Sequence, residues 1–175
     1  MVVACVPVGA QSLAAGLKAG VPLTSLAFGP SAETRRYTFG PSLELGLRYG
    51  LSFEADLLYK RFGFSKTATA GRWEVPLLLK YRLTEKRAKP FFAAGTNFNR
   101  IITPGTLQVA GAELRHRSTR GLTGGCGVEL GTGLIHIVPE FRVTRWADRN
   151  FGVRDAALRS NLTQAEVLFG VLFRP

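Results

Sequence analysis

The 175-residue sequence has no long hydrophobic run, only two cysteines and only two histidines, and each scarcity excludes a class of protein. No apolar run reaches the roughly 18 residues of a membrane-spanning helix, although a closed barrel of strands also satisfies every backbone group in lipid. The widely spaced Cys5 and Cys126 exclude a disulfide framework and a cysteine-based metal site. We therefore expect no metal and no cofactor.

Helix-forming patterns are also scarce, and the composition favours a single all-β domain. The chain holds 20 glycines against one methionine, and 46% of its residues are hydrophobic, enough for a sizeable core. The formal charge of +11 would suit a nucleic-acid binder only if the basic residues gathered on one face or element. Many of them lie instead in connecting segments such as ETRRYT, TEKRAK and ELRHRSTR, so we expect no nucleic-acid partner.

What the sequence does contain is a period of two. From Tyr37 to Tyr59 apolar residues hold the odd positions, and mostly polar or small residues hold the even ones. This alternation predicts extended strands with one apolar and one polar face. The same test along the chain predicts eight strands, most of them about nine to thirteen residues long, which a tilted strand needs to cross a bilayer. They are residues 13–21, two strands within 37–64 that divide near Gly50, and residues 72–83, 91–102, 121–130, 134–146 and 161–173.

The connections between these strands alternate in length. Those after the first, third, fifth and seventh strands are long, whereas the others are tight turns or compact segments. The long ones span residues 23–36, 65–71, 104–120 and 147–160. Long loops at one end and short turns at the other are typical of outer-membrane barrels, whose short turns face the periplasm. We predict an all-β fold, an eight-stranded antiparallel up-and-down transmembrane β-barrel with both termini at the turn end.

The polar face of the strands indicates which side is enclosed. Glycines and serines alternate there with charges of both signs in nearly equal number, which fits a narrow barrel interior in which charges must be paired. A face in contact with water would be more densely charged. The predicted interior ion-pair network consists of Glu44, Arg48, Glu54, Lys80, Arg82, Glu129, Glu140, Arg142 and Glu166.

The apolar face, which includes Leu45 and Leu77, is then predicted to meet lipid. Its aromatic residues gather near strand ends, as interfacial girdles require, although aromatic residues favour any strand. They are Tyr37, Tyr49, Phe53, Tyr59, Trp73, Tyr81 and Phe173. A soluble lipocalin-like barrel, with the apolar face turned inward around a ligand, is the alternative explanation of the same alternation.

Three segments carry a family resemblance: YTFGPSLELGLRYGLSFEADLLYKRFGF, the strand PFFAAGTNF and the last strand AEVLFGVLF. They resemble the small outer-membrane β-barrel proteins of Gram-negative bacteria, the OmpA and OmpX type. The resemblance covers nearly all of residues 13–175 and implies a barrel in the outer membrane, which we expect to be monomeric. In that family the barrel assembly machinery reads an aromatic residue at the end of the final strand, but here Arg174 and Pro175 follow Phe173.

The first residues differ from the rest of the chain. Residues 1–12 are apolar, and Val8, Gly9 and Ala10 have the small-x-small form of a secretory cleavage site. We interpret residues 1–12 as a residual signal peptide or an N-terminal extension, and residues 13–175 as the barrel domain.

Three arginines, Arg61, Arg100 and Arg145, interrupt the apolar face. The strand directions place all three at the upper ends, beside the long loops. Guanidinium groups bind phosphates bidentately, and the outer leaflet of such a membrane is rich in lipopolysaccharide phosphates. We predict that the three arginines form a basic collar that binds lipopolysaccharide, although arginines at this height also reach toward water without a ligand. We expect further arginines in the loops nearby: Arg72, Arg115, Arg117, Arg120 and Arg149.

The histidines offer little for catalysis. His136 has the parity of the interior face, and His116 lies in an arginine-rich loop. A lipid-modifying barrel enzyme would need His, Ser and an acid together on the lipid face. We therefore predict no catalytic residue and a structural or surface-interaction role. A lipid-modifying enzyme and a soluble ligand-binding barrel are the alternatives.

Overall fold

The computed structural model describes residues 12–24, 27–28, 37–63, 69–84, 87–102, 112–114, 118–147, 151–153, 159–160 and 162–175. The proposed cleavage site and Cys5 therefore lie outside the described residues. So do His116, Arg115, Arg117 and Arg149. No helix in the described part of the chain is long and apolar enough to span a membrane.

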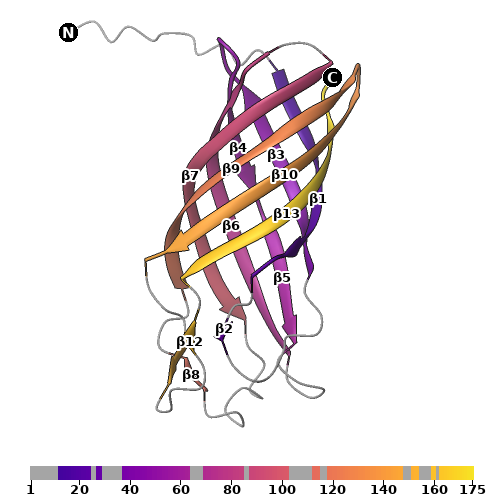
Figure 1. The fold of residues 1–175 in the computed structure, drawn as a ribbon. Coiled ribbons are helices and arrows are strands. Elements are labelled where there is room, and N and C mark those ends of the chain that lie inside the picture. Colours follow the sequence, from indigo (N-terminus) through magenta and orange to yellow (C-terminus); the bar gives the residue numbers. More distant parts are fainter. Residues whose placement is uncertain are drawn as a thin grey trace, which may run out of the picture.

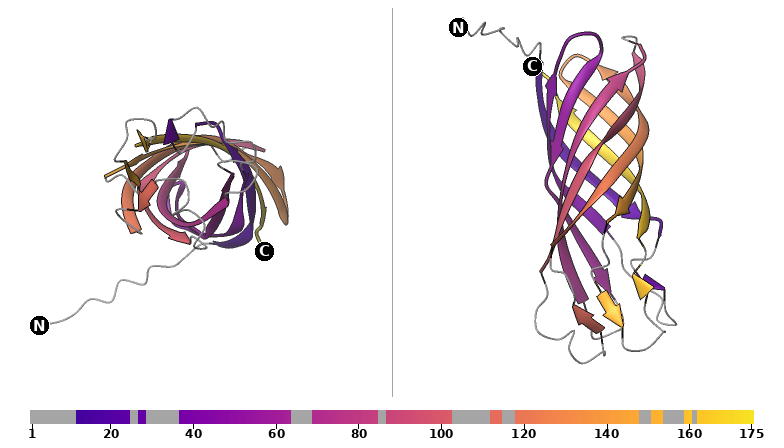
Figure 2. Two further views of the ribbon diagram at one scale, coloured as in Figure 1. Left: turned by 90° about the horizontal axis from the view of Figure 1, so that it is seen from below. Right: turned by 90° about the vertical axis from the view of Figure 1, so that its left-hand side faces the viewer.

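The main body is one closed antiparallel sheet (Figure 1). Its strands are β1 (Ser12–Pro22), β3 (Tyr37–Gly46), β4 (Leu51–Asp56), β5 (Leu58–Gly63), β6 (Thr69–Arg82), β7 (Ala88–Ile102), β9 (Ser118–Thr132), β10 (Ile135–Trp146) and β13 (Thr163–Phe173). The sheet closes because β1 pairs with both β13 and β3. Figure 2 shows the resulting ring of strands from below.

The nine segments make eight barrel strands, because β4 and β5 form one strand interrupted at Leu57. Both segments pair with β3 on one side and with β6 on the other. At the interruption the Leu57 amide donates to the Pro41 carbonyl at 3.0 Å, so the backbone stays hydrogen-bonded to β3. The eight-stranded antiparallel barrel predicted from the alternation is confirmed.

The two ends of the barrel differ as expected. The turn end carries the short connections at residues 47–50, 83–87 and 133–134, and it also holds both Ala15 and Phe173, which pair with each other. In the first of these turns Tyr49 and Gly50 both have positive φ, 61° and 74°, the conformation that suits the twist of a tight hairpin.

The loop end carries the long connections. There β8 (Ala112–Leu114) pairs with β11 (Phe151–Val153), and β12 (Arg159–Ser160) pairs with β2 (Ala27–Phe28) (Figure 1). The strands also run beyond some predicted bounds. For example, β9 begins at Ser118 and ends at Thr132, because its ends pair with β7 and β10 where the apolar alternation has already stopped.

Burial alternates along each strand with the apolar side outward. In β3 the even residues from Thr38 to Gly46 are buried, and the odd residues are exposed or half-buried. Outside, Leu17 and Leu122 are 67% and 69% exposed. A few apolar side chains also face inward, including Leu78, Phe91 and Leu172, which belong to a small interior cluster. Gly127 makes room for one of them, since a Cβ at this position would lie 2.6 Å from the Phe91 ring.

Candidate functional site

The centre of the barrel interior is an ion-pair cluster around Glu54 of β4. Its carboxylate accepts hydrogen bonds from Lys18 Nζ at 2.6 Å, from Arg142 Nη2 at 2.5 Å and from Lys80. Arg142 also donates to Glu140 and to Asp56, at 2.5 and 2.7 Å. These side chains come from β1, β4, β6 and β10, so the cluster crosses the interior from wall to wall. All of them are 3% exposed or less.

A second cluster closes the interior at the turn end, and it uses a residue after the last strand. Arg174 donates from Nη1 to Glu129 Oε1 and from Nη2 to Glu44 Oε1, both at 2.8 Å. Arg82 also pairs with both of these carboxylates, at 2.7 Å to Glu129. His136 Nδ1 lies 2.9 Å from Glu129 Oε1. The chain end after Phe173 therefore contributes to the barrel interior.

A third cluster lies toward the loop end. Lys60 Nζ pairs with Glu74 at 2.9 Å and with Glu166 at 2.6 Å. Arg72 pairs with Glu74 and donates to Gln164 at 2.7 Å. Polar residues from β5, β6 and β13 thus occupy this end of the interior.

Charge in the interior is nearly balanced among the described residues. Seven carboxylates face eight cations, which are Glu44, Glu54, Asp56, Glu74, Glu129, Glu140 and Glu166 against Lys18, Lys60, Arg72, Lys80, Arg82, Lys89, Arg142 and Arg174. Balance is needed because an unpaired ion out of water costs several kcal/mol, of order the whole stability of a domain. Most of the formal +11 of the chain therefore belongs to residues outside the interior.

Eight of the nine residues that the sequence predicts for the interior network lie inside the barrel. The ninth, Arg48, lies outside it. The strand β3 ends at Gly46, and Arg48 lies exposed in the tight turn that follows. Parity along a strand stops having meaning once the chain turns.

Several interior members lie outside the predicted ion-pair network. The alternation places Lys18, Asp56, Lys60 and Glu74 among the charges of the enclosed face, but it does not predict their ion pairs. Arg72 was placed in a loop, but it is buried inside β6, with its guanidinium 5.2 Å from the Trp146 ring centre. Arg174 shares parity with the buried Leu172, so continuing the alternation past Phe173 would have indicated its direction.

The three arginines predicted for the outer face are exposed and lie on three different strands near the loop end. Arg61 of β5 pairs across the sheet with Tyr37, Arg100 of β7 with Trp73, and Arg145 of β10 with Leu122. Arg120, predicted in a loop, is also on the outer face, in β9 opposite Phe98.

Aromatic rings cover the outer face beside Arg61. Tyr37, Phe39, Tyr59 and Trp73 follow one another across β3, β5 and β6, with ring centres 5.2 to 6.0 Å apart. Tyr49 and Tyr81 lie near the turn end, exposed by 87% and 49%. The two groups lie at opposite ends of the apolar band, as the sequence indicates.

Neither alternative function finds its site among the described residues. His136 is buried in the interior, 2.9 Å from both a Glu129 oxygen and the Gly133 carbonyl, so it cannot serve a catalytic group on the outer face. Buried charged side chains line the interior, unlike the apolar ligand cavity of a lipocalin-like barrel.

No protein-family model and no curated protein matches the chain. Solved structures with a similar fold include neisserial surface protein A, NspA, with a TM-score of 0.64 and 16% identity over 93% of this chain and 96% of that one. The N-terminal β-barrel domain of Pseudomonas aeruginosa OprF follows, with a TM-score of 0.55 and 11% identity over 94% and 100%. Ail, the attachment invasion locus protein of Yersinia pestis, has a TM-score of 0.53 and 12% identity over 94% and 97%. The chain thus has the fold of eight-stranded outer-membrane barrels.

Proposed function

We propose that the protein is an integral outer-membrane barrel of a Gram-negative bacterium with a structural or surface-interaction role. The observation that carries this proposal is the inverted distribution of polarity, with paired charges inside and exposed leucines and phenylalanines around the outside. In water, an apolar band of this extent would cause aggregation, whereas lipid covers it at no cost. The loops at the far end from the chain terminus would then face the cell exterior.

The same proposal includes the expected partners. Phe173 ends the last strand on the outer face, where the barrel assembly machinery could read it, and Arg174 turns inward to Glu44 and Glu129. We expect a monomer, because closure of the sheet leaves no strand edge for a second copy to extend. We assign no catalytic residue and no cofactor.

The three stacked ion-pair clusters lead us to expect negligible conductance from the purified protein in planar bilayers. Lys18, Glu54 and Arg142 cross the interior at its centre. Glu54 Oε1 lies 2.6 Å from Lys18 Nζ and 2.5 Å from Arg142 Nη2. Ions would have to break these pairs to pass, at a cost of several kcal/mol for each unpaired charge. The measurement is single-channel recording after reconstitution in a planar bilayer.

Faster migration of unboiled than of boiled protein in gels of the outer-membrane fraction provides the control that the sample is folded and correctly located. Large, steady single-channel currents from such a sample would contradict a closed interior. A protein that is absent from that membrane fraction would contradict the proposed location.

We further propose that Arg61, Arg100 and Arg145 form the basic collar and bind lipopolysaccharide phosphates. Changing all three to Gln should weaken binding of lipopolysaccharide to the purified barrel roughly 10-fold or more. The reason is that the loss of even one charge-assisted hydrogen bond costs about 1.5–3 kcal/mol. The measurement is a binding titration at physiological salt. The matched control is the exposed Arg48→Gln at the turn end, which should bind normally. Unchanged binding by the triple variant rejects the collar.

A further inference from the structure

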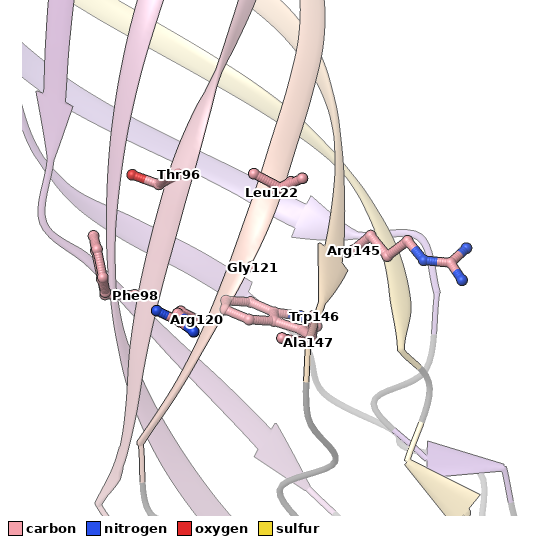
Figure 3. A pocket seen from close by; sticks show the side chains of 8 residues that line it. All are labelled: Thr96, Phe98, Arg120, Gly121, Leu122, Arg145, Trp146 and Ala147. Carbon is pink, nitrogen blue, oxygen red and sulfur yellow. The ribbon is translucent and has the colours of Figure 1, made fainter.

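The outer face of the barrel is hollowed where β7, β9 and β10 approach the loop end (Figure 3). The hollow has a volume of about 450 Å³. It is lined by Thr96, Phe98, Arg120, Gly121, Leu122, Arg145, Trp146 and Ala147. A second hollow of about 580 Å³ adjoins it over β6 and β7 and shares Phe98 and Arg120 with it.

Small outward-facing residues create the space. Gly121 faces inward, where a Cβ would lie 2.9 Å from the buried Trp146 ring, so this glycine lets the ring pack behind the hollow. Farther toward the turn end, Gly124 faces outward between Ala94 and Val143 on the neighbouring strands, and a Cβ there would meet nothing within 4 Å. A trough of small residues therefore runs from the hollow through Thr96, Ala94 and Gly124 toward the middle of the apolar band, beside the exposed Leu122.

Cations rim the loop end of this trough. Arg100, Arg120 and Arg145 lie on adjacent strands, and the structure records no ion pair for any of them within the described residues. Figure 3 shows Arg120 lying beside Phe98 and Arg145 projecting on the opposite side of the hollow. Arg100 and Arg145 lie two strand spacings apart, or roughly 10 Å along the sheet, and Arg120 lies on the strand between them.

We propose that the trough binds one acyl chain of the lipid A portion of lipopolysaccharide, while Arg120 and Arg145 each hold a phosphate of its headgroup. The inference rests on the proposed outer-membrane location, and it places one lipid molecule beside Arg100, Arg120 and Arg145 on β7, β9 and β10. A headgroup with two separated phosphates and several acyl chains matches separated cations above two adjoining apolar hollows. A phospholipid, with a single phosphate, would engage only one side of the rim.

Filling the trough tests the acyl-chain contact without changing charge. Gly124→Phe places a ring in the open space, and Ala19→Phe on the outer face of β1 is the matched control. The affinity of the purified barrel for diphosphoryl lipid A and for phosphatidylglycerol is measured in the same micelles by native mass spectrometry. Gly124→Phe should lower lipid A affinity about fivefold. In an apolar medium, van der Waals packing of the acyl chain in the trough, rather than the hydrophobic effect, favours its binding, and the ring would occupy that space.

Different results would overturn the acyl-chain contact and the arginine collar. Equal lipid A affinity for Gly124→Phe and Ala19→Phe overturns the trough, and so does an equal loss of phosphatidylglycerol binding, which would show a general lipid contact. Arg120→Gln should weaken lipid A binding, whereas Arg48→Gln, exposed at the turn end, should leave it unchanged. Unchanged binding by the triple arginine variant rejects the collar, whatever Gly124→Phe does.

Discussion

Replacing Glu54 by Gln should lower the free energy of unfolding in lipid or detergent by about 3–5 kcal/mol, the cost of leaving buried charges without a partner. The Glu54 carboxylate is fully buried and accepts from Lys18, Lys80 and Arg142. A Gln retains the shape but supplies no negative charge to three buried cations. The measurement is urea unfolding in micelles or vesicles, followed by tryptophan fluorescence.

The control for this prediction is a double-mutant cycle with Lys80→Met. Removing one cation together with Glu54 leaves less uncompensated charge, so the two effects should be non-additive by about 0.5–3 kcal/mol. Additive effects, or a loss below about 1 kcal/mol for Glu54→Gln, would mean that water solvates the centre of the barrel and that the clusters do not close it.

Leu77→Arg should cost about 2–4 kcal/mol in a lipid bilayer if the outer face meets lipid near the midplane. Leu77 lies on the outer face of β6, opposite Ala55 of β4 and Thr96 of β7, about halfway along the strand. A guanidinium there has no partner and must either be desolvated or distort the bilayer. The sequence predicts the same cost for Leu45→Arg, but Leu45 lies one residue before the turn end of β3, so its cost should be smaller. The measurement is reversible unfolding of the barrel in vesicles of defined thickness.

Leu83→Arg is the matched control for depth. Leu83 is 55% exposed just beyond the turn end of β6, where an arginine reaches the headgroups, so the cost should fall to about 0–1 kcal/mol. Equal stability of the Leu77→Arg variant and the unmodified barrel would mean that the outer face is not in lipid, and the membrane assignment would be lost.

The errors of the sequence analysis come from positions near strand ends. Arg48 and Arg72 both have even numbers and follow the alternation, yet Arg48 lies in a turn and Arg72 lies inside a strand. The local pattern does not distinguish them, because strand ends depend on pairing with neighbouring strands rather than on the residues themselves. Arg120 illustrates the same limit, since β9 continues three residues closer to the loops than its apolar pattern indicates.

The sequence by itself determined the strand count, the two faces and the asymmetry of the connections. Alternation with a period of two is a local property, and it assigns each side chain to a face without knowledge of any partner. It also placed Glu54, Lys80 and Arg142 on the enclosed side. Only the tertiary structure decided which of these charges meet, because contact across the interior depends on barrel closure and on the stagger between strands that are far apart in the chain. The joining of Arg174 to Glu44, 130 residues earlier, and the trough beside Gly124 both depend on that stagger, for which no local pattern in the sequence provides a signal.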